Sequence, residues 1–172
     1  APELFDYPFL VCVGQGDVPN WPEQRWQRLA HYVRSGGMIY FDSLTAGDGF
    51  GLRCLERLLR QLPADAAVEL TKDHVLFRTF YLLDNAVGRG LVDAKPQSAH
   101  LDGRMVALAA DVDLAGSLLR DEFGAWAFAC EPGGEAQRER AIRFGVNLMM
   151  YALCTDYKAD QVHIPFLLKR RR

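Results

Sequence analysis

Short apolar runs alternate with amphipathic stretches along the first third of the chain. The unbroken run from Phe9 to Val13 is typical of a strand that is buried on both faces of a parallel sheet. The apolar positions after it recur at helical spacing, and they are Trp26, Leu29, Ala30 and Val33. Asn20 and Glu23 fit a capped start of this helix, with Pro22 in its first turn. Gly36 and Gly37 end it.

The same order of elements repeats directly afterwards. Residues Met38 to Ser43 predict a second buried strand that ends in polar side chains. Four leucines at helical spacing then predict a second helix, closed by Pro63, and they are Leu55, Leu58, Leu59 and Leu62. This succession of strand, helix, strand and helix is the signature of a βαβ unit and a mostly parallel sheet.

The rest of the chain predicts one further strand and a long helix. Residues 64–104 mix short apolar pieces with turn residues, and we expect an excursion with one or two short strands there. Met105 to Asp113 predicts a strand that continues into acidic residues, and residues 133–153 predict the longest helix. With 172 residues, no repeat and no linker, the sequence predicts a single α/β domain over residues 1–172.

Composition and charge exclude several classes of protein. Hydrophobic residues make up 49 % and charged residues 24 % of the chain, which is ordinary globular usage. The net charge of -2 argues against a nucleic-acid binder, and the basic tail Lys169 to Arg172 is expected to be a solvated end. No apolar run approaches the roughly 18 residues of a membrane span and no signal peptide opens the chain, so we expect the domain itself to be soluble.

Polar residues follow three of the predicted strands. Carboxyl ends of parallel strands meet at one rim of the sheet, and ligands of α/β proteins bind there. We therefore expect a ligand-binding site formed by seven residues: Gly14, Gln15, Gly16, Asp17, Asp42, Ser43 and Asp111. Its three aspartates could hold a divalent cation, bind sugar hydroxyls or keep one carboxyl protonated as a general acid. For each aspartate alone, capping of a turn or helix is the alternative interpretation.

Signatures of specific chemistry are missing from the sequence. The stretch from Gly47 to Gly51 matches neither the dinucleotide nor the phosphate-loop pattern, and we expect a turn before a helix. Ser43 is not in a G-x-S-x-G elbow. The four cysteines form no C-x-x-C pair and are expected to be buried free thiols, and the four histidines lack metal-ligand spacing. We therefore predict no metal and no cofactor.

Three segments of the sequence point to a known family. They are PELFDYPFLVCVGQGD, LAHYVRSGGMIYFDS and PGGEAQRERAIRFGVNLMMYALCTDYKADQVHIPFLLKRRR. Together they resemble the DUF4159 family, bacterial domains of unknown function. The resemblance implies a flavodoxin-like three-layer sandwich, similar to class I glutamine amidotransferases. It further implies a longer bacterial protein, exported or membrane-attached through a preceding part, with the first strand and helix of the domain lying outside this sequence.

The chain departs from the patterns of these families at positions that matter for chemistry. Gln15 stands where the loop of the DUF4159 family commonly has histidine, in the pattern G-H-G-D. Amidotransferases need a cysteine nucleophile on an elbow between strand and helix, with a histidine and an acidic partner. Cys12 lies within a predicted strand and Cys54 within a predicted helix. Cys130 lacks the flanking glycines, and His163 has no acidic residue two positions on.

These observations favour a non-catalytic or weakly catalytic domain that binds an unidentified small molecule or protein partner at the rim. One alternative is a hydrolase that acts on an amide or glycan through the rim carboxylates or Cys130. Another is a purely structural interaction module, with an exposed apolar surface where the absent first strand would pack.

Overall fold

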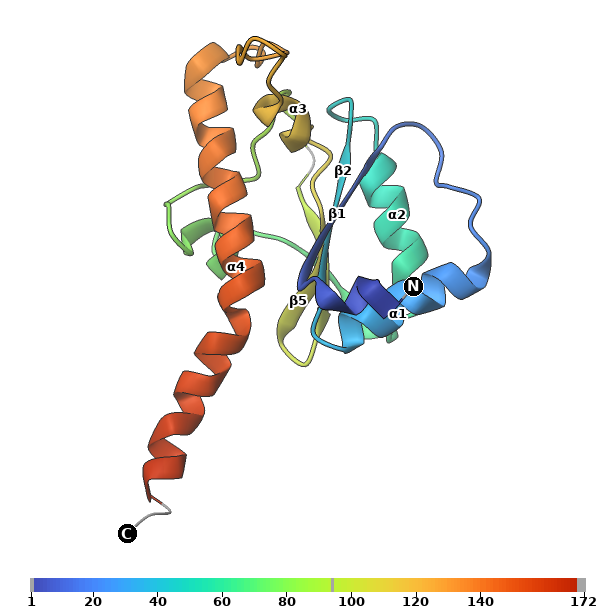
Figure 1. Ribbon diagram of the computed structural model, residues 1–172, viewed down its shortest axis with the longest axis vertical. Coiled ribbons are helices and arrows are strands. Elements are labelled where there is room, and N and C mark those ends of the chain that lie inside the picture. The colour runs from blue at the N-terminus through green and yellow to red at the C-terminus, as the bar shows by residue number, and fades with distance from the viewer. Residues whose placement is uncertain (1, 94, 170–172) are drawn as a thin grey trace.

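A five-stranded sheet forms the centre of the molecule, as the computed structural model in Figure 1 shows. The structure describes residues 2–93 and 95–169, and only the backbone of Pro2, Ala64 and residues 155–169. The strands have the spatial order β1-β2-β5-β4-β3. Their bounds are Phe9–Gly14 for β1, Met38–Ser43 for β2, Ala67–Glu69 for β3, Gln97–Leu101 for β4 and Arg104–Ala109 for β5.

The sheet is mostly parallel, as the sequence predicts. β1 pairs parallel with β2, and β2 pairs parallel with β5. β4 is antiparallel to both β5 and β3, so it alone of the described strands runs in the opposite direction. Both β3 and β4 lie in the 64–104 excursion, which confirms the prediction of short strands there.

Helices cover both faces of the sheet (Figure 1). One face packs against α1 and α2, and the other against α3 and α4. Their bounds are Glu23–Arg34 for α1, Phe50–Leu59 for α2, Leu114–Leu118 for α3 and Gly134–Lys169 for α4. Short 3-10 turns cover Pro2–Asp6, Ala64–Ala66 and Val75–Arg78.

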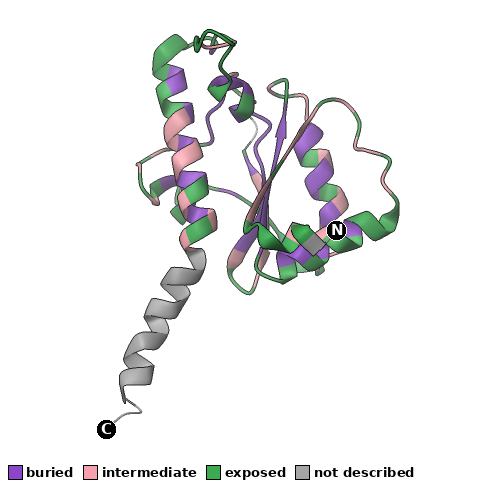
Figure 2. Cartoon of the chain, in the orientation of Figure 1, coloured by how far each residue is buried: buried purple, intermediate pink, exposed green. Residues whose placement is uncertain are grey.

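Alternating side chains of the central strands fill two hydrophobic cores, one on each face. On β2, Ile39 and Phe41 face α1 and α2, whereas Met38 and Tyr40 face α4. Every residue of β2 is buried, and buried positions line the inner sides of the helices (Figure 2). This packing fixes the direction in which the polar end of β2, Asp42 and Ser43, enters the rim.

Three local predictions are wrong. β1 is not buried on both faces, because it lies at the edge of the sheet and Val11 is 54 % exposed. Asn20 does not cap α1, because Pro22 occupies the position before its first residue, Glu23. β5 ends at Ala109 rather than at residue 113, because the backbone turns into left-handed conformations with φ of 49° at Asp111 and 55° at Asp113.

The C-terminal end of the chain bears on two further expectations. Within the described residues, no helix combines the length and the apolar character that crossing a membrane requires. The side chains of the basic tail and of His163 lie outside the described part of the structure.

Candidate functional site

The carboxyl ends of β1, β2 and β5 meet at one rim of the sheet. Gly14 and Ser43 are aligned at the ends of β1 and β2, and the Leu44 backbone N–H donates to the Gly14 carbonyl at 2.7 Å. The Ser43 hydroxyl donates to the Asp111 carboxylate, which follows β5. The structure thus brings together Gly14, Asp42, Ser43 and Asp111, four of the residues predicted to form the site.

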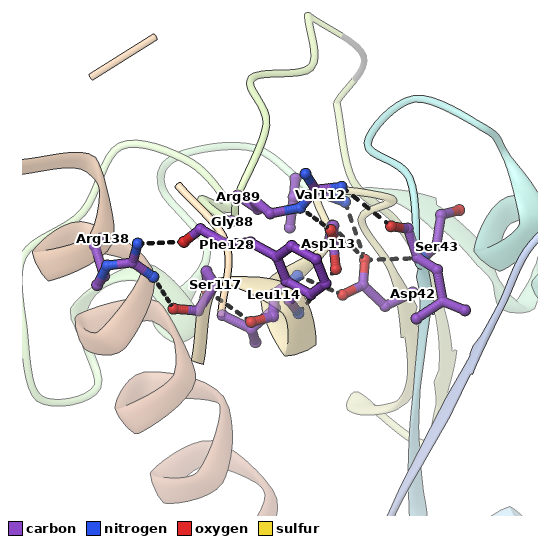
Figure 3. Close-up of polar contacts among 12 residues, drawn as sticks. Asp42, Ser43, Gly88, Arg89, Val112, Asp113, Leu114, Ser117, Phe128 and Arg138 are labelled. Atoms are coloured by element: carbon purple, nitrogen blue, oxygen red, sulfur yellow. Dashed lines mark hydrogen bonds and ion pairs between the residues drawn. The ribbon is translucent and has the colours of Figure 1, made fainter. Parts of the chain in front are cut away.

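Asp42 is fully buried and accepts four hydrogen bonds from backbone N–H groups (Figure 3). Oδ1 accepts from Ser43 at 3.0 Å, from Val112 at 3.0 Å and from Asp113 at 3.1 Å. Oδ2 accepts from Leu114, the first residue of α3, at 2.6 Å. Burial raises the pKa of Asp42 to about 6, while the backbone donors oppose this rise. The carboxylate therefore holds the loop between β5 and α3.

Asp111 has the same role at the start of α2. Its Oδ1 accepts from the Gly51 N–H at 2.7 Å and its Oδ2 from the Leu52 N–H at 3.0 Å. The Ser43 hydroxyl oxygen accepts from the Phe50 N–H at 3.1 Å. The anion site that a helix N-terminus offers is therefore occupied by a carboxylate of the protein itself. The glycine-rich turn before α2 has no free first-turn amides for a phosphate.

Gly51 allows this close approach between α2 and the sheet. A Cβ atom at residue 51 would lie 2.6 Å from Oδ1 of Asp111 and 2.8 Å from the carbonyl oxygen of Phe41. Real Cβ atoms do not come so near to such atoms. Gly51 thus lets the start of α2 pack closely on the sheet. This agrees with the sequence prediction of a turn that leads into a helix here.

Asp113 and Arg89 extend this network. Asp113 precedes α3, and its Oδ1 accepts from the Gly116 N–H at 2.8 Å. Its other carboxylate oxygen forms an ion pair with Nε of Arg89, whose guanidinium lies 5.2 Å from the Phe128 ring centre. Asp113 is visible in the sequence as a polar residue near a strand end. Arg89 was missed, because it lies in an irregular segment without periodicity, 24 positions away.

The loop after β1 forms the exposed part of the rim. Gln15 and Asp17 are exposed, whereas Gly14 and Gly16 are half-buried. The Gly16 N–H donates to Oδ2 of Asp48 at 3.0 Å, and Asp48 pairs with Arg53 of α2 at 3.3 Å. We call Gly14–Asp17 the rim loop, and Asp42, Ser43 and Asp111 the inner rim. Only the rim loop presents predicted site side chains to solvent.

A cleft of about 370 Å³ opens at the same rim, beyond β5, β4 and β3. It lies there because β4 runs backwards, so the residues that precede β4 join those that follow β3 and β5. Phe77 and Val112 contribute apolar lining. The polar lining residues are exposed, among them Lys72, Asp84 and Asp93. Sequence patterns did not indicate this cleft, because its residues come from irregular segments.

A family model matches residues 1–153 and is described as a domain of unknown function, DUF4159. The chain belongs to this family. No curated protein matches the chain.

A nucleophilic Cys130 and a metal site have little geometric support in this DUF4159 domain. Cys130 is 3 % exposed and burial raises the pKa of its thiol, whereas a nucleophilic cysteine needs an accessible thiolate. Among the residues that the structure describes, no three His, Cys, Asp or Glu side chains are grouped to hold a metal ion. His74 caps a 3-10 turn, because its ring nitrogen Nδ1 accepts from the Leu76 N–H at 3.2 Å.

Proposed function

We propose that this DUF4159 domain is a non-catalytic binding module for an unidentified small molecule or protein partner. The proposed site is the rim, with Gly14, Gln15, Gly16 and Asp17 in contact with the ligand and Asp42, Ser43 and Asp111 beneath them. One observation supports this assignment above the others: the polar groups of the inner rim are buried and engaged with backbone N–H groups. Such groups hold loops in place and are unsuited to proton transfer or metal binding.

The exposed groups of the rim are suited to recognition. Gln15 offers an amide donor and acceptor, and Asp17 offers a carboxylate. The Gly16–Asp48 hydrogen bond and the Asp48–Arg53 pair hold their loop against α2, so little ordering is needed when a ligand binds. The nearby cleft adds an apolar floor with polar residues at its mouth, the usual composition of a small-molecule site.

Broader features of the proposal follow the family resemblance. A flavodoxin-like or amidotransferase-like kinship is supported by a mostly parallel sheet with helices on both faces. Bacterial origin, and export or membrane attachment of the whole protein, belong to the same proposal. A hydrolase that uses Cys130 or the rim carboxylates is the less favoured alternative, because Cys130, Asp42 and Asp111 are buried and of the three rim aspartates only Asp17 is exposed.

Thermal unfolding of the dialysed domain against divalent metals, sugars, nucleotides and amino acids tests this function. A ligand at about 100 times its dissociation constant adds roughly 2.7 kcal/mol to the free energy of unfolding, which raises the midpoint. We expect one class to raise it, and Asp17→Asn to reduce that shift. Asp93→Asn reports on the cleft in the same way, and the exposed Asp65→Asn is the matched control. No shift of the midpoint with any ligand of the panel would contradict a small-molecule site at the rim. So would a shift that neither Asp17→Asn nor Asp93→Asn reduces.

A second candidate function, protein binding by strand addition, is favoured by β1, because no described strand pairs with its outer side. Beside this edge lies an apolar groove of about 520 Å³, lined by residues of β1, β2, α3 and α4 that include Val11, Leu118 and Met149. Within the described strand Phe9–Gly14 there is no charged residue and no bulge, and its apolar sequence resembles that of an interior strand. An added strand would complete the sheet and cover the groove.

A second copy of the domain is the simplest strand donor to test. We expect the wild-type domain to associate as its concentration rises, and Val11→Lys to keep it monomeric by placing a charge beside the edge. Sedimentation equilibrium measures both states. Wild-type protein that stays monomeric, or a Val11→Lys variant that associates equally well, would contradict strand addition between copies.

A further inference from the structure

Two cysteines face each other where α2 packs on β1. The Phe50 ring covers Gly14, since a Cβ atom at residue 14 would lie 2.3 Å from that ring. Cys54 follows Phe50 by four residues on the same helix face, about 6 Å further along the axis. Cys12 precedes Gly14 by two residues on the same strand face, about 6.6 Å back along β1. Because α2 starts at the rim and runs back along the strand, Cys54 and Cys12 pack in the same core cluster between α2 and β1.

The contact makes the two thiols unequal. A hydrogen bond between the two side chains lowers the pKa of Cys12, whereas the same bond and burial raise the pKa of Cys54. Cys54 is 1 % exposed, whereas Cys12 is half-buried because β1 is an edge strand. Oxidants therefore reach Cys12 first, and the more acidic thiol is also the accessible one.

We propose that Cys12 and Cys54 form an oxidation site, which a hydroperoxide converts into an intramolecular disulfide between β1 and α2. Cys130 and Cys154 are not part of this site. Cys130 precedes α4 and Cys154 lies within it, and α4 packs on the opposite face of the sheet.

The reaction has two steps that balance without another reactant. The Cys12 thiolate attacks one peroxide oxygen, the O–O bond breaks, and the departing oxygen takes up a proton to leave as water or an alcohol. Cys12 is then a sulfenic acid. The Cys54 sulfur attacks the Cys12 sulfur, an S–S bond forms, and the hydroxyl group leaves with the Cys54 proton as water. Two electrons have passed from the two thiols to the peroxide.

Peptide mapping of the peroxide-treated domain tests this site. After hydrogen peroxide, alkylation and digestion with trypsin under non-reducing conditions, we expect the peptide Ala1–Arg25 linked to the peptide Cys54–Arg57. Two of the four thiols should become unavailable to alkylation. Cys130→Ser should give the same linked pair, since Cys130 lies on the other face. Four alkylated thiols after treatment, or a disulfide that joins other cysteines, would overturn the proposal.

Single substitutions separate the two roles. In Cys54→Ala, dimedone should label Cys12 as the sulfenic acid, because the resolving thiol is gone. In Cys12→Ser, at the half-buried position, Cys54 should stay reduced and unlabelled. Circular dichroism establishes whether each variant is folded. If Cys54→Ala unfolds, the linked peptide pair in the wild type still decides whether Cys12 and Cys54 form the disulfide. Equal labelling of Cys54 in Cys12→Ser would refute the assignment of Cys12 as the attacking thiol.

Discussion

Asp42→Asn is expected to lower the free energy of unfolding by about 2–4 kcal/mol at neutral pH. An amide can present one oxygen to the backbone donors, but its NH₂ group would face the N–H of Leu114 or those of Ser43, Val112 and Asp113, where a second acceptor is required. Donors left unpaired in this buried loop lose their hydrogen bonds without gaining water. Urea unfolding at equilibrium measures the loss. The exposed Asp17→Asn is the matched control, with a change within about 0.5 kcal/mol.

Acidification gives an independent check on Asp42. Its pKa is raised to about 6 from an ordinary 3.8, so the folded state binds this proton more tightly than the unfolded chain. The contribution of this group to stability is therefore greatest below the unfolded pKa and is lost as pH rises through about 6. We expect the stability gap between wild type and Asp42→Asn to be wider at about pH 5 than at about pH 7.5. A gap that narrows on acidification would mean that the pKa of Asp42 is not raised.

Asp111→Ala is expected to cost a similar amount, about 2–4 kcal/mol. The change leaves the Gly51 and Leu52 N–H groups and the Ser43 hydroxyl without their acceptor, and it removes a negative charge from the N-terminus of α2. Ser43→Ala keeps the carboxylate and its two backbone bonds, so its cost should be smaller, about 1 kcal/mol. Equilibrium unfolding of the two variants compares these costs. Equal costs, or an Asp111→Ala protein as stable as wild type, would contradict the capping role.

The central part of the fold follows from local patterns in the sequence. β2 begins with an unbroken apolar run from Met38 to Phe41, and α2 has leucines at helical spacing, so both are recognisable without tertiary information. Their order predicts parallel strands, and parallel strands bring Asp42 and Asp111 to one rim. That much of the candidate site could be predicted.

The hydrogen-bond partners of the Asp42 and Asp111 carboxylates could not be predicted. The backbone donors of Asp42 lie up to 72 positions away and those of Asp111 up to 60, so no local pattern relates them. A strand end with an aspartate has the same sequence whether its carboxylate faces a ligand or a helix N-terminus. The edge position of β1 in the sheet could not be predicted either, because the spatial order of strands is not a property of the strand sequence. The cleft and Arg89 belong to irregular segments, which lack a period to analyse.

Hydrogen exchange of assigned backbone amides tests most directly whether the inner rim is a closed support beneath an open rim loop. The N–H groups of Gly51, Leu52, Val112 and Leu114 donate to buried carboxylates, so they should be strongly protected in the wild type. Asp42→Asn should reduce the protection of Val112 or of Leu114, whichever N–H faces the new NH₂ group, but leave that of Gly51 and Leu52. Rapid exchange at all four amides in the wild type would show that the inner rim is open to solvent, and would contradict its structural role.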